Sequence, residues 1–191
     1  MTDLILNRVF IQRALHVLAS AFVMLGIAGA AFGVGGPKVV STRAFLATDA
    51  VHPGQTARLA VLAQIDPGYH INDHKPSLDY LIPTKIEFDA SPAFRVENVV
   101  YPHGKPMKFD FLDTPISVYE GEVRLGTLLK IESSAKPGSY ALRGKFTYQA
   151  CNNYACLPPT SAPVEALVRV VPSFVPLKPV NSEIFKTIKP R

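Results

Sequence analysis

Residues 123–148, VRLGTLLKIESSAKPGSYALRGKFTY, decide the fold class. They contain two long runs, 123–131 and 140–148, in which apolar residues alternate with polar or small ones. Such alternation is typical of half-buried β-strands, because successive side chains of a strand point to opposite faces. Proline and glycine lie between the two runs, within residues 133–138, and favour a turn. The stretch therefore predicts two strands joined by a turn.

Shorter alternating segments lie on both sides of this pair. No segment beyond residue 36 has the length and periodicity expected of a helix. Glycine and proline separate the segments at intervals of about ten residues, which is the spacing of a sandwich of short strands. We therefore predict an all-β fold, an immunoglobulin-like antiparallel β-sandwich of about eight or nine strands. The further predicted strands are 44–48, 56–65, 85–88, 94–101, 116–120 and 164–171.

The composition indicates one globular domain. The chain has 191 residues, of which 48% are apolar and 18% charged, so it can form a core and is not of the disordered class. Its net charge of +5 comes from single Lys and Arg residues, and no basic run that could follow a phosphate backbone is present. We therefore expect no nucleic-acid partner.

The first 30 residues have the features of a signal peptide. Arg8 and Arg13 precede the apolar segment 17–27, and small residues follow at 28–31. An uncleaved anchor helix is the alternative, because the uncharged run is about long enough to span a bilayer. In both cases the remainder of the chain is expected to be exported, periplasmic and exposed to oxidising conditions, with any membrane contact made only by an uncleaved N-terminus. We expect the folded domain at residues 44–171 and a packed-down or mobile C-terminal extension at 172–191.

The two cysteines, Cys151 and Cys156, have only four residues between them. A pair this close forms a structural disulfide, half of a metal site, or a redox couple. Asn152 and Asn153 favour a turn between the cysteines, and Pro158 follows where the strand would have to continue. The spacing alone leaves a structural disulfide and a redox couple equally supported.

A metal site is the weaker alternative. His70 and His74 together with the two cysteines have the ligand types of a Cys2His2 zinc site. The spacing is not a familiar metal-binding one, and an oxidising compartment favours a disulfide over free thiols. We therefore expect no metal and no cofactor.

Several motifs together resemble the N-terminal periplasmic domain of the thiol:disulfide interchange protein DsbD. They are residues 67–72 (PGYHIN), 74–76 (HKP), 82–84 (IPT), 101–102 (YP), 119–121 (YEG), and YQAC at 148–151 with CLPP at 156–159. The likeness extends over about residues 44–171. It implies an immunoglobulin-like domain that carries electrons from a thioredoxin-like or membrane thiol donor to exported acceptors of the disulfide isomerase or cytochrome maturation type, and hence a component of a protein-disulfide reductase.

The resemblance also implies roles for individual residues. Cys151 and Cys156 correspond to the exchanging pair, and Cys156 to the cysteine that forms the mixed disulfide with the partner. His70 and Asn72, with the adjacent Tyr69, occupy positions beside the pair, where a loop hydrogen-bonding role is the alternative. Residues 109–112 resemble the loop that caps the pair, with Phe111 the first candidate for the covering ring and Phe109 the second. A core role is almost equally supported for either ring.

Two differences from the family limit which of its properties can be expected of this chain. The gap between the cysteines is slightly shorter than in the best-known members, so the local geometry and the reduction potential are expected to differ. The sequence also has no segment resembling the multi-span membrane domain or the thioredoxin-like domain of the family. We therefore expect the electron donor to be a separate chain. A binding module with a structural loop disulfide is the competing hypothesis.

Overall fold

The computed structural model describes residues 37–109 and 112–188 of the chain. The predicted signal peptide lies outside these residues. The described part is all-β, apart from one short helix near its end, and it contains no helix long and apolar enough to cross a membrane. The elements are β1 (Val40–Leu46), β2 (Thr56–Ile65), β3 (His70–Asn72), β4 (Lys85–Phe88), β5 (Phe94–Val96), β6 (Lys105–Met107), β7 (Ile116–Tyr119), β8 (Glu122–Ile131), β9 (Gly138–Tyr148), β10 (Ala150–Cys151), β11 (Thr160–Val170) and α2 (Ser182–Lys186).

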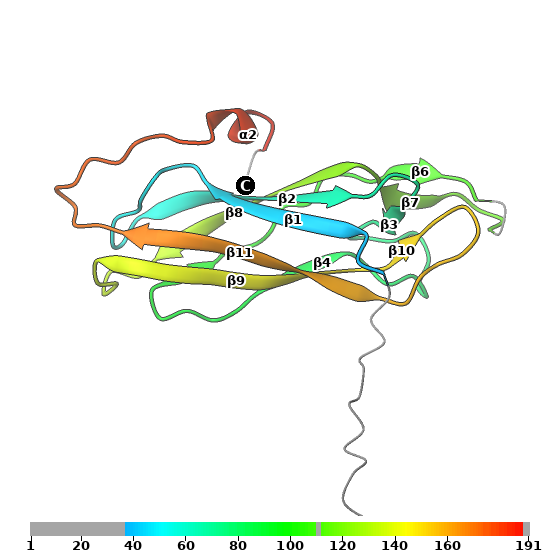
Figure 1. Cartoon of the computed structure of the whole chain (residues 1–191), viewed down its shortest axis with the longest axis horizontal. Helices are drawn as coiled ribbons and strands as arrows, with labels where there is room; N and C mark the ends of the chain where they lie inside the picture. Colours follow the sequence, from blue (N-terminus) through cyan, green and yellow to red (C-terminus); the bar gives the residue numbers. More distant parts are fainter. Residues whose placement is uncertain (1–36, 110–111, 189–191) are drawn as a thin grey trace, which may run out of the picture. The chain divides into compact units, whose positions relative to one another are not determined.

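The strands form an immunoglobulin-like sandwich of antiparallel sheets, as predicted. One layer has the strand order β1-β2-β8-β5, and the facing layer has the order β11-β9-β4. Figure 1 shows the two layers one above the other, with β3, β6, β7 and β10 gathered at one end. These four strands form a third, smaller sheet in the order β10-β3-β7-β6.

Alternation along β9 and β11 places their apolar side chains between the layers. Leu142, Phe146 and Tyr148 of β9 are buried, whereas Arg143 and Lys145 between them are exposed. Phe146 packs in one core cluster with residues of the opposite layer. Full burial of such a side chain contributes about 1.5–3 kcal/mol, so the strands that alternate most regularly also hold the layers together.

Gly144 shows how closely the edge strand β4 approaches β9. A Cβ atom built at this position would meet the carbonyl oxygen of Glu87 at 2.5 Å. Gly144 is paired in register with Phe88, so any larger residue would displace β4 at this point. The glycine within the predicted strand is therefore required by the pairing.

The small end sheet has two differently packed faces. Ile71 of β3 is paired with Tyr119 of β7 and with Ala150 of β10, and all three residues belong to the main core. The neighbouring residues in each strand point the other way, because side chains alternate across a strand. Val118 and Ile116 on that outer face pack in a separate cluster with Phe109 and Leu81. The outer face of the end sheet is thus covered by loops rather than by a second sheet.

The C-terminal segment packs on the outer face of β2. Phe185 of α2 and Ile188 are buried against Ala60 and Leu62. The guanidinium group of Arg58 donates hydrogen bonds to the carbonyl oxygens of Phe185 and Ile188, at 2.9 and 2.6 Å. The C-terminal extension was expected to be either packed on the domain or mobile, and residues 172–188 are packed. The helix α2 is an element that the sequence pattern did not predict.

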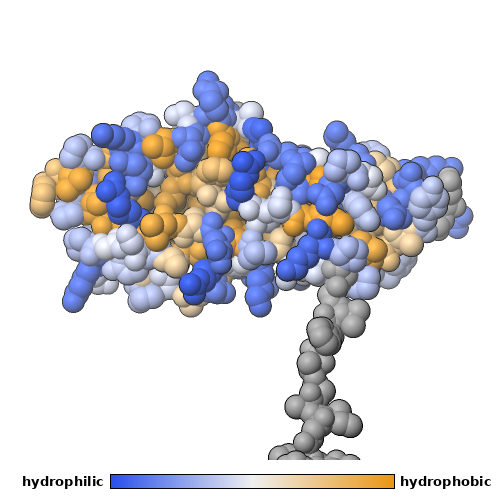
Figure 2. All heavy atoms as spheres, viewed as in Figure 1, coloured by the Kyte–Doolittle hydropathy of each residue, from blue (hydrophilic) through white to orange (hydrophobic). Residues whose placement is uncertain are grey.

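Other differences concern short strands. β3, β6 and β10 lie in segments that were predicted as loops, β1 begins at Val40 rather than at residue 44, and the strand predicted over 94–101 ends at Val96. Strands of two or three residues are too short to show an alternating pattern, so only the pairing partner defines them. On the face seen in Figure 2, hydrophilic residues are interspersed among hydrophobic ones, as expected for the outward positions of a sandwich.

Candidate functional site

The two cysteines are joined by a disulfide across a tight β-hairpin. Cys151 ends β10, and the Cα atoms of Cys151 and Cys156 are 3.9 Å apart. Backbone hydrogen bonds lie on both sides of the disulfide, from the Asn152 N–H to the Ala155 carbonyl (3.0 Å) and from the Leu157 N–H to the Ala150 carbonyl (2.7 Å). The segment expected to be a loop is therefore paired backbone.

Asn152 shapes the turn of this hairpin. Its side-chain oxygen accepts hydrogen bonds from the N–H groups of Tyr154 and Ala155, both at 2.9 Å. Asparagine commonly closes turns in this way, because its short side chain reaches the backbone two or three residues further on. The prediction that asparagine forms the turn is confirmed for Asn152.

The two sulfur-bearing residues differ in exposure. Cys151 is 0% exposed, whereas Cys156 is an exposed residue. The residues around Cys156 are also open to solvent, and the ring of Tyr154 at the hairpin tip is 89% exposed. A protein thiol can therefore approach the disulfide from the Cys156 side and not from the Cys151 side.

His70 is the residue paired with Cys151. The register of β10 and β3 places the two directly opposite each other. Directly opposite residues of an antiparallel pair project from the same face, with Cβ atoms about 4.5–5.5 Å apart. The ring of Phe109 stacks on the imidazole of His70, with centroids 4.2 Å apart and an angle of 24° between the planes. Cys151, His70 and Phe109 thus come together on the outer face of the end sheet.

The imidazole of His70 is deeply buried and has a nitrogen without a visible partner. His70 is 2% exposed, and its Nε2 atom has no hydrogen-bond partner among the described residues. Desolvation by burial lowers the pKa of His70 to about 4. The ring is therefore neutral near pH 7.

Asn72 connects the neighbouring loop to the cysteine hairpin. Its side-chain amide donates to the carbonyl oxygen of Ile82 at 3.0 Å and to the side-chain oxygen of Gln149 at 3.3 Å. Gln149 in turn donates to the carbonyl oxygen of Leu157 at 3.4 Å. Thr84 donates to the carbonyl oxygen of Asn72. Asn72 is fully buried, and its observed contacts are those of a loop-fastening residue.

The remaining expected neighbours are Tyr69, Phe109 and Phe111. Tyr69 is half-buried against the main core, which also contains Ala150 of β10. Phe111 lies outside the described residues, so of the two expected covering rings only Phe109 can be placed. Phe109 is 4% exposed and packs with Val118, so it contributes to a small core as well as covering His70.

Asp73 is a residue of this region that the sequence did not single out. Its carboxylate accepts hydrogen bonds from the hydroxyl groups of Tyr119 (2.6 Å) and Ser117 (2.7 Å) and from the N–H groups of Gly104 (3.1 Å) and Lys75 (3.2 Å). Burial raises the pKa of the Asp73 carboxyl, but these four hydrogen bonds outweigh it and the pKa is lowered. The pKa of Tyr119 is raised by burial and by its bond to Asp73. Asp73 thereby ties β3 to β7 and to the loop at residue 104.

The histidines do not form a metal site with the cysteines in this structure. The ring of His74 stacks on Tyr101, with centroids 3.7 Å apart, and its Nδ1 lies 3.1 Å from the carbonyl oxygen of Thr84. Both sulfurs are bonded to each other and are not thiolates. Among residues 37–109 and 112–188, no three His, Cys, Asp or Glu side chains are grouped so that they could hold a metal ion.

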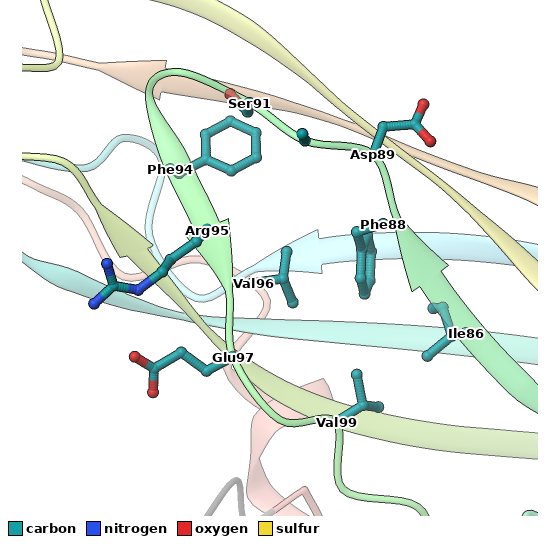
Figure 3. Close-up of a pocket in the computed structure, with 10 residues that line it drawn as sticks. Ile86, Phe88, Asp89, Ser91, Phe94, Arg95, Val96, Glu97 and Val99 are labelled. Carbon is teal, nitrogen blue, oxygen red and sulfur yellow. The ribbon is translucent and has the colours of Figure 1, made fainter.

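A pocket of about 390 Å³ lies at the open edge of the sandwich, away from the cysteines. It is bordered by the edge strands β4 and β5. In Figure 3 the side chains of Phe88 and Val96 point toward the space between these strands, whereas Arg95 and Glu97 point away from it. None of the candidate site residues lines this pocket.

Comparison with known proteins agrees with the resemblance noted from the motifs. A family model described as thiol:disulfide interchange protein DsbD, N-terminal, matches residues 39–167. Comparison with curated protein sequences found no match.

Two solved structures are similar to this chain. The N-terminal periplasmic domain of ScsB from Proteus mirabilis is 19% identical, with a TM-score of 0.45 over 68% of this chain and 46% of that chain. The match therefore spans less than half of the ScsB chain. The DsbD N-terminal domain of Neisseria meningitidis in the reduced form is 18% identical, with a TM-score of 0.41 over 68% of this chain and 85% of that chain.

Proposed function

Because the chain belongs to the family of the N-terminal domain of the thiol:disulfide interchange protein DsbD, we propose that it carries electrons by thiol-disulfide exchange through Cys151 and Cys156. The observation that supports this most directly is the unequal exposure of the pair, with Cys151 buried and Cys156 exposed. Thiol-disulfide exchange requires that one sulfur can be attacked while the other leaves. The proposed partners are a thioredoxin-like or membrane thiol donor and an exported disulfide acceptor.

The exchange proceeds in two balanced steps. A thiolate of the donor attacks the sulfur of Cys156, forming an intermolecular disulfide, and the bond to Cys151 breaks with its electron pair left on the Cys151 sulfur. The second thiol of the donor, as its thiolate, then attacks the donor's first sulfur, which is bonded to Cys156 in the mixed disulfide. This step releases Cys156 as a thiolate. The donor is oxidised to a disulfide, and this chain gains two electrons and, from solvent or from the donor, two protons.

Delivery to an acceptor is the reverse sequence. The thiolate of Cys156 attacks the acceptor disulfide, and Cys151 then closes the ring and releases the reduced acceptor. The short gap between Cys151 and Cys156 favours this closure, because the hairpin holds the two residues on directly facing positions. Phe109 is proposed to shield the pair from other thiols, together with Phe111, for which the placement next to the pair remains the expectation from the family resemblance.

The domain organisation and the cellular location are part of the proposal. Residues 1–30 are proposed to be a signal peptide or an anchor, residues 44–171 the redox domain, and residues 172–191 a C-terminal extension. The working location is the periplasm or an equivalent exported compartment, where disulfides and thiols exchange under the control of dedicated carriers.

A structural disulfide is the competing function. A bridge that closes so small a loop stabilises a protein by about 2 kcal/mol in the chain-entropy model. The hairpin is already paired by backbone hydrogen bonds on both sides of the cysteines and closed by Asn152. The bridge is therefore not needed to hold this turn, which favours a role in exchange.

The test uses single-cysteine variants of the full chain. The probe is a thioredoxin variant that retains only its nucleophilic cysteine, activated as an aromatic mixed disulfide. Cys151→Ser, which keeps the exposed Cys156, is expected to form the protein-protein disulfide at least tenfold faster than Cys156→Ser, which keeps the buried Cys151. Equal rates would argue against the proposed roles.

A second measurement separates exchange from a structural role. The oxidised wild-type chain is equilibrated with reduced and oxidised glutathione. Exchange predicts a reduction potential within the range of thiol carriers, above about −300 mV, whereas structural disulfides of secreted proteins lie below it. A lower potential together with slow reduction by thioredoxin would support the structural disulfide.

A further inference from the structure

His70 has a buried nitrogen that has no hydrogen-bond partner among residues 37–109 and 112–188, and neither the fold nor the exchange chemistry explains this. Its Nε2 atom is enclosed by protein, and His70 is 2% exposed. Leaving a buried polar atom without a hydrogen bond costs free energy, so such an atom in a native structure calls for an explanation. In the oxidised state the nearest paired residue, Cys151, offers only a disulfide sulfur, which is a weak acceptor.

The same residue is held in a fixed place beside Cys151. The register of β10 and β3 sets the two side chains opposite each other on one face, and Figure 1 shows these strands side by side at the end of the sandwich. Phe109 stacks on the imidazole from the loop that follows β6. The stacked ring limits rotation of His70, so its nitrogen atoms keep their place relative to the sulfur.

Exchange creates a strong acceptor at this position. When a donor thiolate attacks Cys156, the electron pair of the broken bond and its negative charge move to the Cys151 sulfur. Cys151 is 0% exposed, and water cannot solvate a thiolate formed there. A buried thiolate without a hydrogen-bond donor is unfavourable, because burial penalises the charged form.

We propose that His70 is a positioning residue whose neutral imidazole donates a hydrogen bond from Nε2–H to the Cys151 thiolate in the mixed-disulfide and reduced states. The proton stays on His70, and any proton that the Cys151 sulfur later takes up is the one that the donor's second thiol releases on ionising, so charge and electrons balance without a further reactant. Hydrogen bonds to an ionised acceptor are stronger than those between neutral groups, so this contact favours the reduced form over the disulfide. The inference rests on the proposed exchange function.

Three variants of the full chain separate this contact from simple packing. His70→Phe keeps an aromatic ring against Phe109 and removes both ring nitrogens. His70→Gln retains a side-chain N–H donor. His74→Phe is the matched control, because His74 lies in the same segment and stacks on Tyr101 instead.

The main readout is the equilibrium with glutathione at pH 7. His70→Phe is expected to shift the equilibrium constant about tenfold toward the disulfide, which corresponds to about 30 mV for a two-electron couple. His70→Gln is expected to remain within about threefold of wild type, and His74→Phe to be unchanged. A wild-type potential in His70→Phe, or an equal shift in His70→Phe and His70→Gln, would overturn the hydrogen bond.

A spectroscopic measurement keeps the inference testable if His70→Phe does not fold. The imidazole nitrogens of the ¹⁵N-labelled wild-type chain are followed by NMR before and after reduction. The Nε2 atom is expected to carry the proton and to shift on reduction as its hydrogen bond to sulfur forms. An Nε2 signal that does not change would overturn the inference. Failure of this inference can be distinguished from failure of the proposed function. In the second case the disulfide of the wild-type chain, with His70 in place, would itself resist reduction by thioredoxin.

Discussion

The ring of Phe109 stacks on the imidazole of His70, with centroids 4.2 Å apart, and His70 is paired in register with Cys151. Two segments far apart in the sequence thus meet at His70, next to the buried half of the disulfide. The exposed half, Cys156, is not enclosed in this way. The disulfide is therefore open to solvent on the Cys156 side and closed on the Cys151 side.

Phe109→Ala is expected to make the disulfide less selective. Removing the ring opens the face that carries Cys151, so reduction by a small thiol such as dithiothreitol should accelerate several-fold. The free energy of unfolding should fall by about 3–5 kcal/mol, because Phe109 also belongs to a buried cluster. Phe109→Leu, which keeps much of the buried volume, is the control. The rate of reduction is measured by alkylation of the free thiols at timed intervals. Equal rates in the wild type, Phe109→Ala and Phe109→Leu would contradict a shielding role.

Asn152→Ala is expected to weaken the hairpin that keeps the two sulfurs together. The variant loses the two hydrogen bonds to the N–H groups of Tyr154 and Ala155, each of which is worth about 1 kcal/mol. The effective concentration of one thiol at the other then falls, and the glutathione equilibrium should move at least fivefold toward the dithiol. Asn153→Ala is the matched control, because no side-chain hydrogen bond of Asn153 is recorded. An equal response of the two variants would show that Asn152 does not set the turn.

Asp73→Asn is expected to lower stability in a pH-dependent manner. The four hydrogen bonds to the carboxylate lower the pKa of Asp73 in the folded state, so ionised Asp73 stabilises the fold above the pKa of the unfolded chain, near 3.8. This contribution is lost as the pH falls through the lower folded-state pKa. The variant should therefore be less stable by about 1.5–3 kcal/mol at pH 7, and the difference from wild type should shrink in acid.

Urea unfolding at pH 7 and at pH 3 measures this difference. Asp79→Asn, in an exposed position of the following loop, is the control and should be within about 0.5 kcal/mol of wild type at both values. If the difference in free energy of unfolding between wild type and Asp73→Asn were larger at pH 3 than at pH 7, the lowered pKa of Asp73 would be contradicted.

Phe185→Ala is expected to release the C-terminal segment from the domain. Phe185 is buried against β2, and its ring lies 4.9 Å from the guanidinium carbon of Arg58. Loss of this packing should cost about 3–5 kcal/mol in chemical unfolding. Phe174→Ala is the matched control because Phe174, in the same segment, is 86% exposed. Similar effects of both variants would show that the segment is not anchored through Phe185.

Some of the site could be predicted from local sequence. The turn formed by Asn152 depends on a few adjacent residues. The choice of Cys156 as the cysteine that meets the partner came from the family resemblance and not from the spacing of the cysteines. Tyr69 packs on the main core, and its expected role beside the pair stays a prediction. Asp73 was not singled out, because its four partners come from β7 and two loops that no local pattern connects.

The sequence by itself determined the sandwich, because alternation of apolar and polar residues in β8 and β9 is a local pattern. It can be identified without knowing which strand pairs with which. The short strands β3 and β10 were decided only by tertiary pairing, since two or three residues carry no period. The burial of Cys151, which is paired with His70, was likewise decided in three dimensions. Which sulfur water can reach depends on what segments distant in the chain place over it, and spacing between two cysteines contains no information about that.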